Sequence, residues 1–428
     1  MRGWWGGLAA AVALAPACGG SAPGDDATDV RETAEVGDDD GGTGGDADAP
    51  GDEGPDGGLD GDSDGVGDDG EDAEVGGDGD ADDGGDGGDG DSDDGGGTDG
   101  DAAEVAGRIF GGTVTDPWAA EAPGGALGTA LDGLVGAGGR RPTARVVFDE
   151  GIDRIFRSGG LDASVYVPLV GSIASHAVVM GELLDSLYVG DYDLDQYRLR
   201  ACEYRATLGH LVDSWEIGNE VNGEWLGSGV LEKLAAAADV FAADAAGFAA
   251  ACPGFALRPD EKAFGLALTF YYNGPYDGGV PTADNCWSDA SHAMERWVDD
   301  GFAAPGALGT ERIAPVLDLV LVSYYEDDCE GLQPEWGPVF DHLGEVFPGA
   351  ALGFGECGTQ VAGSKVAYVR RYYQGMDLPD AEFANMHVDH PRFVGGFFWW
   401  YFSDDLADAD VYGGFVEALS GPFWGGGP

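Results

Sequence analysis

The chain has 428 residues, and its 80 acidic residues stand against 20 Lys and Arg, which gives a formal net charge of −60. This balance argues against nucleic acid as a partner, because no cluster of basic side chains is present to neutralise phosphates. It also argues against electrostatic docking on an anionic lipid surface.

Residues 1–18 have the composition of an export signal. They carry one positive charge, Arg2, then the apolar run Leu8–Ala15, and they end at Ala17-Cys18. The run is too short to span a bilayer as a helix, so it predicts a secretory signal peptide. A cysteine after a small residue resembles a bacterial lipoprotein signal, which implies lipidation of Cys18 and anchoring at the cell envelope or cell surface. The alternative is an ordinary signal with an incidental cysteine and a soluble secreted protein.

Residues 19–106 consist almost entirely of Asp, Gly, Ala, Glu and Ser, with 33 acidic residues and one basic residue, Arg31. With almost nothing apolar to bury, this tract is expected to be a disordered, self-repelling tether.

Four acidic residues inside the tract match the spacing of an EF-hand calcium loop: Asp60, Asp62, Asp64 and Glu71. The run also resembles calcium-binding thrombospondin type 3 repeats. Chance matches are expected in an Asp/Gly background, and no amphipathic helix flanks the run. We therefore favour diffuse attraction of cations over a specific site, and no cofactor is predicted.

The body, 107–428, holds nearly all the aromatic residues and is long enough for one large α/β domain. Apolar runs predict eight strands, at Arg108–Val114, Ala144–Phe148, Ser164–Val170, Ser214–Gly218, Phe264–Phe270, Leu317–Val322, Ala351–Phe354 and Gly396–Tyr401. Helices are expected at Val179–Leu187, Leu194–Val212, Val230–Ala251, Ala290–Asp300, Gly337–Val346 and Ser364–Tyr373. Eightfold alternation predicts a (β/α)8 TIM barrel. An open doubly wound sheet is the alternative, but no Gly-x-Gly-x-x-Gly turn follows the first strand.

Five cysteines lie in the body, and an exported chain can form disulfides. Because five is odd, at least one cysteine should remain free, and Cys357 is our choice. Plausible pairs are Cys202 with Cys252 and Cys286 with Cys329.

Two short β-like runs end on a glutamate. Trp-Glu-Ile-Gly-Asn-Glu closes predicted strand four at Glu220, and Gly-Phe-Gly-Glu-Cys-Gly closes predicted strand seven at Glu356. The carboxyl ends of barrel strands meet at one face, so the two carboxyl groups should converge there. Two such groups are what cleavage of a sugar acetal requires, one as proton donor and one as nucleophile or stabilising anion. Glu216, on the same strand face as Glu220, is expected in a polar network inside the barrel.

An Asn-Glu pair closing strand four and a glutamate closing strand seven resemble the clan A glycoside hydrolases, retaining enzymes on a (β/α)8 barrel. The resemblance implies Glu220 as general acid/base, Glu356 as nucleophile and Asn219 as ligand of the sugar 2-hydroxyl. It further implies one of Tyr324 and Tyr325 beside the nucleophile, and one of Trp399 and Trp400 under the sugar. The expected partner is a β-linked polysaccharide or oligosaccharide, and the enzyme is expected to be a monomer.

Two further residues are candidates for lining the cleft. Tyr272 follows predicted strand five, and His176 follows predicted strand three. Each has a structural alternative, since a buried aromatic ring is also ordinary packing.

One departure from that clan concerns an arginine that many members carry at the end of strand two. Here that end reads Phe148-Asp149-Glu150, and the candidates to replace the arginine are Arg145, Arg154 and Arg108. If none does, the alternative is a catalytically inactive carbohydrate-binding surface lipoprotein on the same barrel. A third possibility is a calcium-dependent adhesion protein whose acidic tract is the functional part.

Overall fold

The computed structural model describes residues 107–115, 125–148, 162–274, 287–325, 327, 334–374, 388–421 and 424. Several positions singled out above lie outside these residues: Cys18, the acidic tract with its calcium pattern, Asp149, Glu150, Arg154, Cys286 and Cys329.

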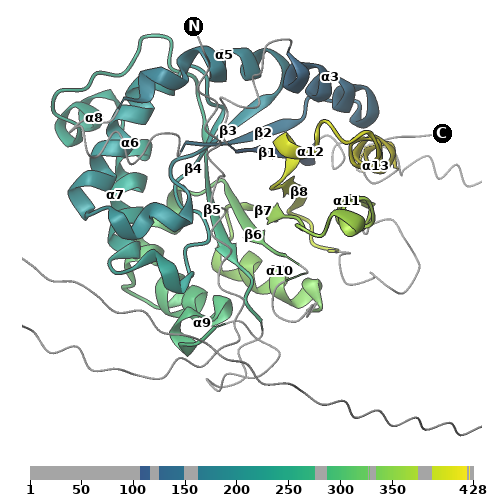
Figure 1. Ribbon diagram of the computed structural model, residues 1–428. Coiled ribbons are helices and arrows are strands. Elements are labelled where there is room, and N and C mark those ends of the chain that lie inside the picture. Colours follow the sequence, from purple (N-terminus) through teal and green to yellow (C-terminus); the bar gives the residue numbers. More distant parts are fainter. Residues whose placement is uncertain are drawn as a thin grey trace, which may run out of the picture. The chain divides into compact units, whose positions relative to one another are not determined.

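Eight parallel strands form a closed barrel in chain order, with β1 hydrogen-bonded to both β2 and β8 (Figure 1). The strands are β1 (Ile109–Val114), β2 (Thr143–Val147), β3 (Val178–Glu182), β4 (Ser214–Glu216), β5 (Gly265–Tyr271), β6 (Leu319–Ser323), β7 (Ala351–Cys357) and β8 (Phe393–Trp399). Closure excludes the open doubly wound sheet and confirms the predicted barrel.

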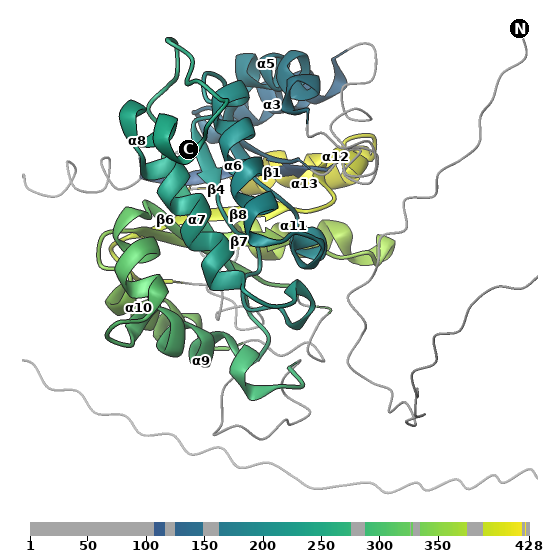
Figure 2. The same ribbon diagram turned by 90° about the vertical axis from the view of Figure 1, so that its left-hand side faces the viewer.

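Helices pack outside the strands: α3 (Ala126–Gly138), α5 (Val167–His176), α6 (Leu194–Leu208), α7 (Val230–Ala242), α8 (Ala245–Ala251), α9 (Met294–Val298), α10 (Trp336–Val346), α11 (Lys365–Gln374), α12 (Phe402–Asp405) and α13 (Ala409–Leu419). Figures 1 and 2 show α6 and α7 side by side, where the two helices contact each other. The single helix predicted at Val230–Ala251 is in fact two helices, because the Asp244 side chain accepts the Gly247 N–H and caps the start of α8.

The prediction for strand three is wrong. Ser164–Val170, expected as a strand, forms a 3-10 turn and the first half of α5. Asp162 caps that turn and Pro168 occupies the first turn of α5, both of which are helix-start signals. The true strand β3 begins one residue before the stretch predicted as the helix Val179–Leu187 and takes up its first half. Short apolar runs do not distinguish a strand from a buried helix by periodicity alone.

The apolar core has two parts. Met180, Ala267, Leu321 and Phe398 form a small cluster separate from the main core, which packs between the strands and the helices. In β8, Gly395 and Gly396 have φ of 92° and 98°, Phe397 has φ of 61°, and the pairing register shifts beside them. Phe397 stacks on Phe354 in the main core at 4.8 Å, while Phe398 belongs to the small cluster. The irregular strand thereby sets which way the following tryptophans face.

One disulfide joins Cys202 of α6 to Cys252 directly after α8, and Cys357 of β7 is a free, buried thiol. Both predictions are confirmed. The bridge closes a long loop across α7, so it stabilises the fold by about 4 kcal/mol in the chain-entropy model.

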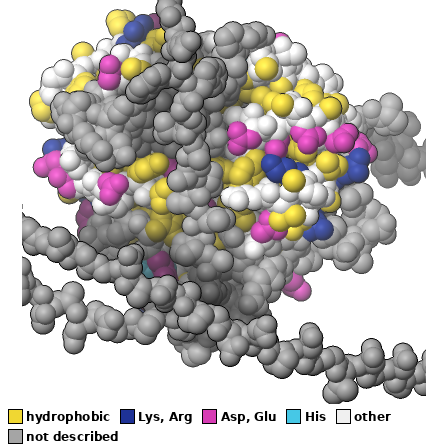
Figure 3. Space-filling view, viewed as in Figure 1, with side chains coloured by type: hydrophobic (Ala, Val, Ile, Leu, Met, Phe, Trp, Pro, Cys, Tyr) yellow, Lys and Arg dark blue, Asp and Glu magenta, His cyan; other side chains and the backbone are white. Residues whose placement is uncertain are grey.

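The surface carries charges of both signs. Figure 3 shows Lys and Arg beside Asp and Glu on the right of the molecule, where α11 and α13 lie in Figure 1. Arg370 and Glu417 pair there at 2.7 Å. None of the helices in the described residues combines the length and apolar character needed to cross a membrane.

Candidate active site

The ends of β4 and β7 converge on the two predicted carboxyl groups. Asn219 Nδ2 donates to Glu356 Oε1 at 2.8 Å, which places the residue beside Glu220 in contact with Glu356. Both glutamates are nearly buried, with 8% of Glu220 and 4% of Glu356 exposed. The charge of Glu356 acts on Glu220, so the two carboxyl groups lie near each other at the carboxyl end of the barrel, where barrel enzymes carry their chemistry.

The chain bends sharply between β4 and Glu220. A Cβ on Gly218 would lie 2.3 Å from Leu234 Cδ2, so a larger residue there would have to displace the leucine side chain. Glu220 itself has φ of 48°, the left-handed region that most side chains avoid. Strained backbone of this kind is frequent at functional sites, where the surrounding structure holds a residue in place.

Arg145 occupies the place of the missing arginine. Its Nη2 lies 2.9 Å from Glu356 Oε1 and 3.0 Å from Glu182 Oε2, and its Nε lies 2.6 Å from Glu216 Oε2. The guanidinium is fully buried. Of the candidate arginines, Arg145 therefore contacts Glu356, the predicted nucleophile, from within β2 rather than from its end. The departure that favoured an inactive barrel is removed.

Two more carboxyl groups complete this buried network. Glu216 is held by two hydrogen bonds from Arg145 and one from the Thr269 hydroxyl, as expected for a residue inside the barrel. Glu182, at the end of β3, is fully buried, and neither of its oxygens accepts a hydrogen bond from the described residues. Sequence reading missed Glu182 because Val179–Leu187 was assigned to a helix.

Burial controls the charge on the two central glutamates. Desolvation raises the pKa of Glu220 well above its usual value, and the charges of Glu356 and Asp185 raise it further. Desolvation also raises the pKa of Glu356, to about 7, although Arg145 and the hydroxyl of Tyr325 pull it down. Because the guanidinium contacts Glu356 and makes no comparable contact with Glu220 among the described residues, we place the proton of the pair on Glu220.

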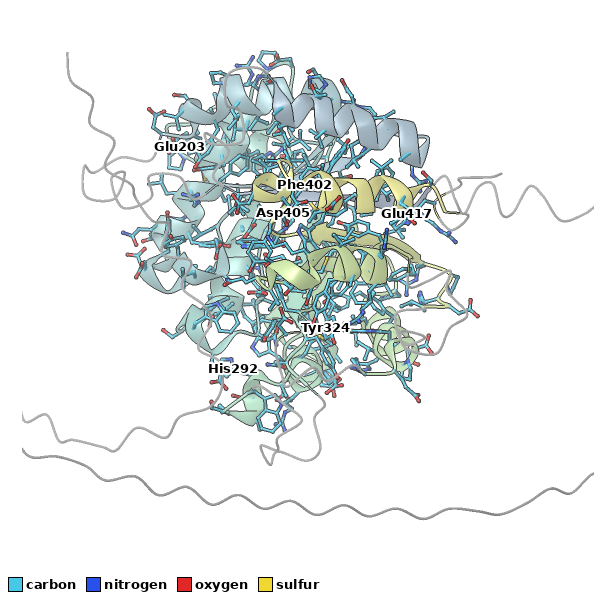
Figure 4. All side chains as sticks on the ribbon, turned by 45° about the vertical axis from the view of Figure 1, so that its right-hand side comes forward. Glu203, His292, Tyr324, Phe402, Asp405 and Glu417 are labelled. Atoms are coloured by element: carbon cyan, nitrogen blue, oxygen red, sulfur yellow. A yellow bond between two sulfur atoms is a disulfide. The ribbon has the colours of Figure 1, made fainter. Side chains whose placement is uncertain are left out.

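Of the two candidate tyrosines, Tyr325 reaches the site. Its hydroxyl donates to Glu356 Oε2 at 2.7 Å. The ring of Tyr324, which Figure 4 labels, packs on Trp336 of α10 at 4.9 Å. Tyr272, expected in the cleft, is 2% exposed and packs on the same Trp336 at 5.1 Å. Tyr324 and Tyr272 therefore belong to the layer between strands and helices.

The two tryptophans also divide. The Trp400 ring lies 5.9 Å from the Arg145 guanidinium, so it borders the carboxylate network. Trp399 is fully buried, and its Nε1 donates to Asp405 Oδ2 at 2.8 Å (Figure 4 labels Asp405, on α12). Adjacent strand residues face opposite ways, so Trp400 is the candidate floor for a sugar and Trp399 is core.

His176 does not line the cleft. It ends α5, ahead of β3, and its Nδ1 lies 2.9 Å from Asp132 of α3. This position is at the amino end of β3, opposite the carboxyl ends that carry Glu220 and Glu356. The error follows from the wrong placement of strand three.

Two residues near Glu220 were missed. Ser186 Oγ donates to Glu220 Oε2 at 3.1 Å, and Trp225 Nε1 donates to Ser186 Oγ at 3.1 Å. Both lie in short 3-10 turns of the loops after β3 and β4, where no sequence pattern marks them. No group of three or more His, Cys, Asp or Glu in the described residues is arranged to hold a metal ion.

Comparison with known proteins gives likenesses of structure alone. No protein-family model matches the chain, and no curated protein does. Among solved structures, the chain is similar to a family 1 β-glucosidase from Thermotoga maritima, with 9% identity, a TM-score of 0.43, and coverage of 73% of this chain and 97% of the other. It is also similar to xylanase 10B from Thermotoga maritima, with 12% identity, a TM-score of 0.43, and coverage of 76% and 98%. With identities and TM-scores this low, the likeness does not assign any chemistry to this chain. The closed barrel is established by the strand pairing of the structure itself.

Proposed function

We propose that the protein is a retaining glycoside hydrolase in which Glu356 is the nucleophile and Glu220 the general acid/base. The observation that carries the proposal is the unequal setting of the two carboxyl groups. Arg145 and Tyr325 contact Glu356 at 2.9 Å and 2.7 Å, whereas Glu220 is buried beside a serine hydroxyl. Two carboxyl groups whose surroundings divide them into an anion and an acid are suited to acetal cleavage.

In the first step, a Glu356 oxygen attacks the anomeric carbon and the bond to the leaving oxygen breaks. That oxygen keeps the bonding electrons and takes the proton of Glu220. The products are a glycosyl ester on Glu356, a free alcohol and a Glu220 carboxylate.

In the second step, the Glu220 carboxylate takes a proton from water while the water oxygen attacks the anomeric carbon. The ester bond breaks and Glu356 recovers its negative charge. Esterification removes that charge in between, so the pKa of Glu220 falls when it has to act as a base.

Two neighbouring groups would hold the sugar. Asn219 Oδ1 is buried and accepts no hydrogen bond from the described residues, so it is available to a sugar hydroxyl. The Trp400 ring offers an apolar face, and sugar rings stack on such faces. The motif resemblance favours a β-linked polysaccharide or oligosaccharide as substrate.

The test is a panel of aryl α- and β-glycosides with wild type, Glu220→Gln and Glu356→Gln. We expect hydrolysis by wild type alone, and labelling of Glu356 by a 2-deoxy-2-fluoro glycoside, seen as a modified peptide in mass spectra. Equal turnover by all three proteins would end the proposal. Because Arg145 contacts Glu356, the lack of an arginine at the end of strand two no longer favours an inactive binding protein.

We further propose that the enzyme is exported and anchored at the cell envelope by a lipid on Cys18, with the acidic tract as a tether. The support is the composition of residues 1–106. In whole cells, Cys18→Ala should release the enzyme into the medium. Retention of that variant at the membrane would contradict lipidation. Deleting 19–106 should reduce cleavage of insoluble polymer, and unchanged cleavage would contradict a role as spacer.

A further inference from the structure

A chain of two hydrogen bonds reaches Glu220 from the loops beside it. Trp225 Nε1 donates to Ser186 Oγ at 3.1 Å, and Ser186 Oγ lies 3.1 Å from Glu220 Oε2. Ser186 is 4% exposed, so bulk water does not compete for its hydroxyl. The arrangement is separate from the Arg145 network, which contacts Glu356.

The donor and acceptor roles in these two hydrogen bonds are fixed by the indole N–H of Trp225. An indole N–H only donates, so Ser186 Oγ must accept from Trp225. A hydroxyl has one hydrogen, and Glu220 Oε2 is the one acceptor that the described residues offer to it. Oε2 of Glu220 is therefore an acceptor, and the acidic proton of Glu220 belongs on the other oxygen, Oε1.

Local structure holds both residues in place. Asp185 caps the 3-10 turn that Ser186 begins, with its side chain accepting the Leu187 N–H at 2.8 Å. The Trp225 ring packs edge-on against Tyr271 at 5.6 Å. A Cβ on Gly223 would lie 2.6 Å from the Trp225 ring, so glycine leaves the room that the indole occupies.

We propose that Ser186 and Trp225 are positioning residues that fix which oxygen of Glu220 carries the proton for the leaving group. This inference rests on the proposed function and adds two residues to it. During glycosylation the Glu220 proton moves from Oε1 to the leaving oxygen as its bond to the anomeric carbon breaks. The Ser186 hydroxyl then stays on Oε2 and stabilises the carboxylate that is formed.

Leaving groups of different acidity separate this role from a structural one. A 2,4-dinitrophenolate leaves without protonation, whereas a phenolate needs the acid. Because kcat/KM reports glycosylation and not the later hydrolysis of the ester, it isolates the step in which the proton is donated. The probes are the 2,4-dinitrophenyl and phenyl glycosides of the sugar that wild type cleaves best in the panel above.

Ser186→Ala is expected to lower kcat/KM for the phenyl glycoside roughly 10- to 100-fold, and that for the dinitrophenyl glycoside by about twofold or less. Trp225→Phe keeps the ring and removes the N–H, so it should shift the two substrates in the same direction by less. Ser186→Thr keeps the hydroxyl and should restore the phenyl glycoside. Ser175→Ala, an exposed serine on α5, is the control and should change neither.

Each outcome either supports or overturns the positioning role of Ser186. Equal losses on both substrates in a folded Ser186→Ala protein, or no loss on either, would overturn the positioning role while leaving the hydrolase intact. Failure of Ser186→Thr to restore the phenyl glycoside would also count against it. If wild type cleaves no glycoside of the panel, the proposed function fails, and this inference fails with it.

Discussion

Nη2 of Arg145 lies 2.9 Å from Oε1 of Glu356, with the arginine side chain fully buried and the glutamate side chain 5% exposed. The same Nη2 also lies 3.0 Å from Glu182 Oε2. Desolvation alone would lower the pKa of Arg145, but Glu182, Glu216 and Glu356 together raise it well above its usual value. The guanidinium is thus a permanent cation at the centre of the barrel, and the charge state of Glu356 depends on it.

Removing that cation should destabilise the barrel. Arg145→Met leaves buried carboxyl groups without a counter-charge, which costs about 3–5 kcal/mol for a buried ion pair broken on one side. Urea unfolding of the two proteins measures the difference. Arg198→Met is the control, because Arg198 is half exposed in its 2.9 Å pair with Asp195, and exposed pairs contribute about 0–1 kcal/mol. Equal costs for the two variants would contradict the central role of Arg145.

Glu216 and Glu182, the two other buried glutamates beside Arg145, should differ in their effect on the pH profile of kcat/KM. Glu356 must be ionised to attack, so the acidic limb of kcat/KM should lie near its pKa of about 7. The charge of Glu216 contributes to raising that pKa, so Glu216→Gln should move the limb to lower pH.

Glu182→Gln is the matched control for that variant. Asp185 and Glu216 are the carboxyl groups whose charges chiefly raise the pKa of Glu356, and Glu182 is not among the main contributors. The limb should therefore stay in place in Glu182→Gln. A shift in Glu182→Gln as large as in Glu216→Gln would contradict the separate role of Glu216.

Stability should fall with pH in the range where activity rises. The pKa of Glu356 is raised from 4.5 to about 7 by burial, so between these values the folded chain holds a proton that the unfolded chain has lost. The contribution of this group is full below pH 4.5 and is lost as the pH rises through 7. Glu356→Gln cannot ionise, so its Tm should drop less between pH 5 and pH 8 than that of wild type. Parallel Tm curves would contradict the raised pKa, and Asp195→Asn, at an exposed position of α6, serves as control.

The adjacent tryptophans should separate binding from stability. Trp400→Ala removes the ring near Arg145 and should lower kcat/KM about tenfold, mainly through KM, with little change in Tm. Trp399→Phe breaks the 2.8 Å hydrogen bond to Asp405 and should cost about 1–3 kcal/mol in unfolding free energy while KM stays unchanged. The reverse assignment would follow if Trp399→Phe alone raised KM.

Strand ends were predictable where the sequence places a polar residue directly after a long apolar run. Glu356 satisfies that condition, whereas Glu220 was marked by the Asn-Glu pair of its motif, and the structure brings the two segments together. Strand three was misassigned because Val178–Glu182 and Ser164–Val170 are both short apolar runs, which periodicity does not separate. Asp162 and Pro168 were the local signals for a helix in the second run. Glu182 and His176 were lost or misplaced as a direct result.

The direction of individual side chains was the second feature that could not be predicted from the sequence. Arg145 lies three residues before the end at which an arginine was sought, and only the closed barrel shows that its long side chain reaches Glu356. Likewise, Tyr324 and Tyr325 are neighbours with opposite directions, and the bulge in β8 decides between Trp399 and Trp400. Ser186 and Trp225 lie in loops, where no period links sequence to direction.

The left-handed main chain at Glu220 costs stability, whereas the proposed chemistry requires a glutamate at this position. Glycine or asparagine would sit there with less conformational cost, roughly 1 kcal/mol by the usual penalty for a side chain in this region. Either replacement deletes the proton donor. If the proposed function holds, a related chain that had lost the activity would gain thermal stability by such an exchange, so a glutamate at position 220 is expected only where the chain is active.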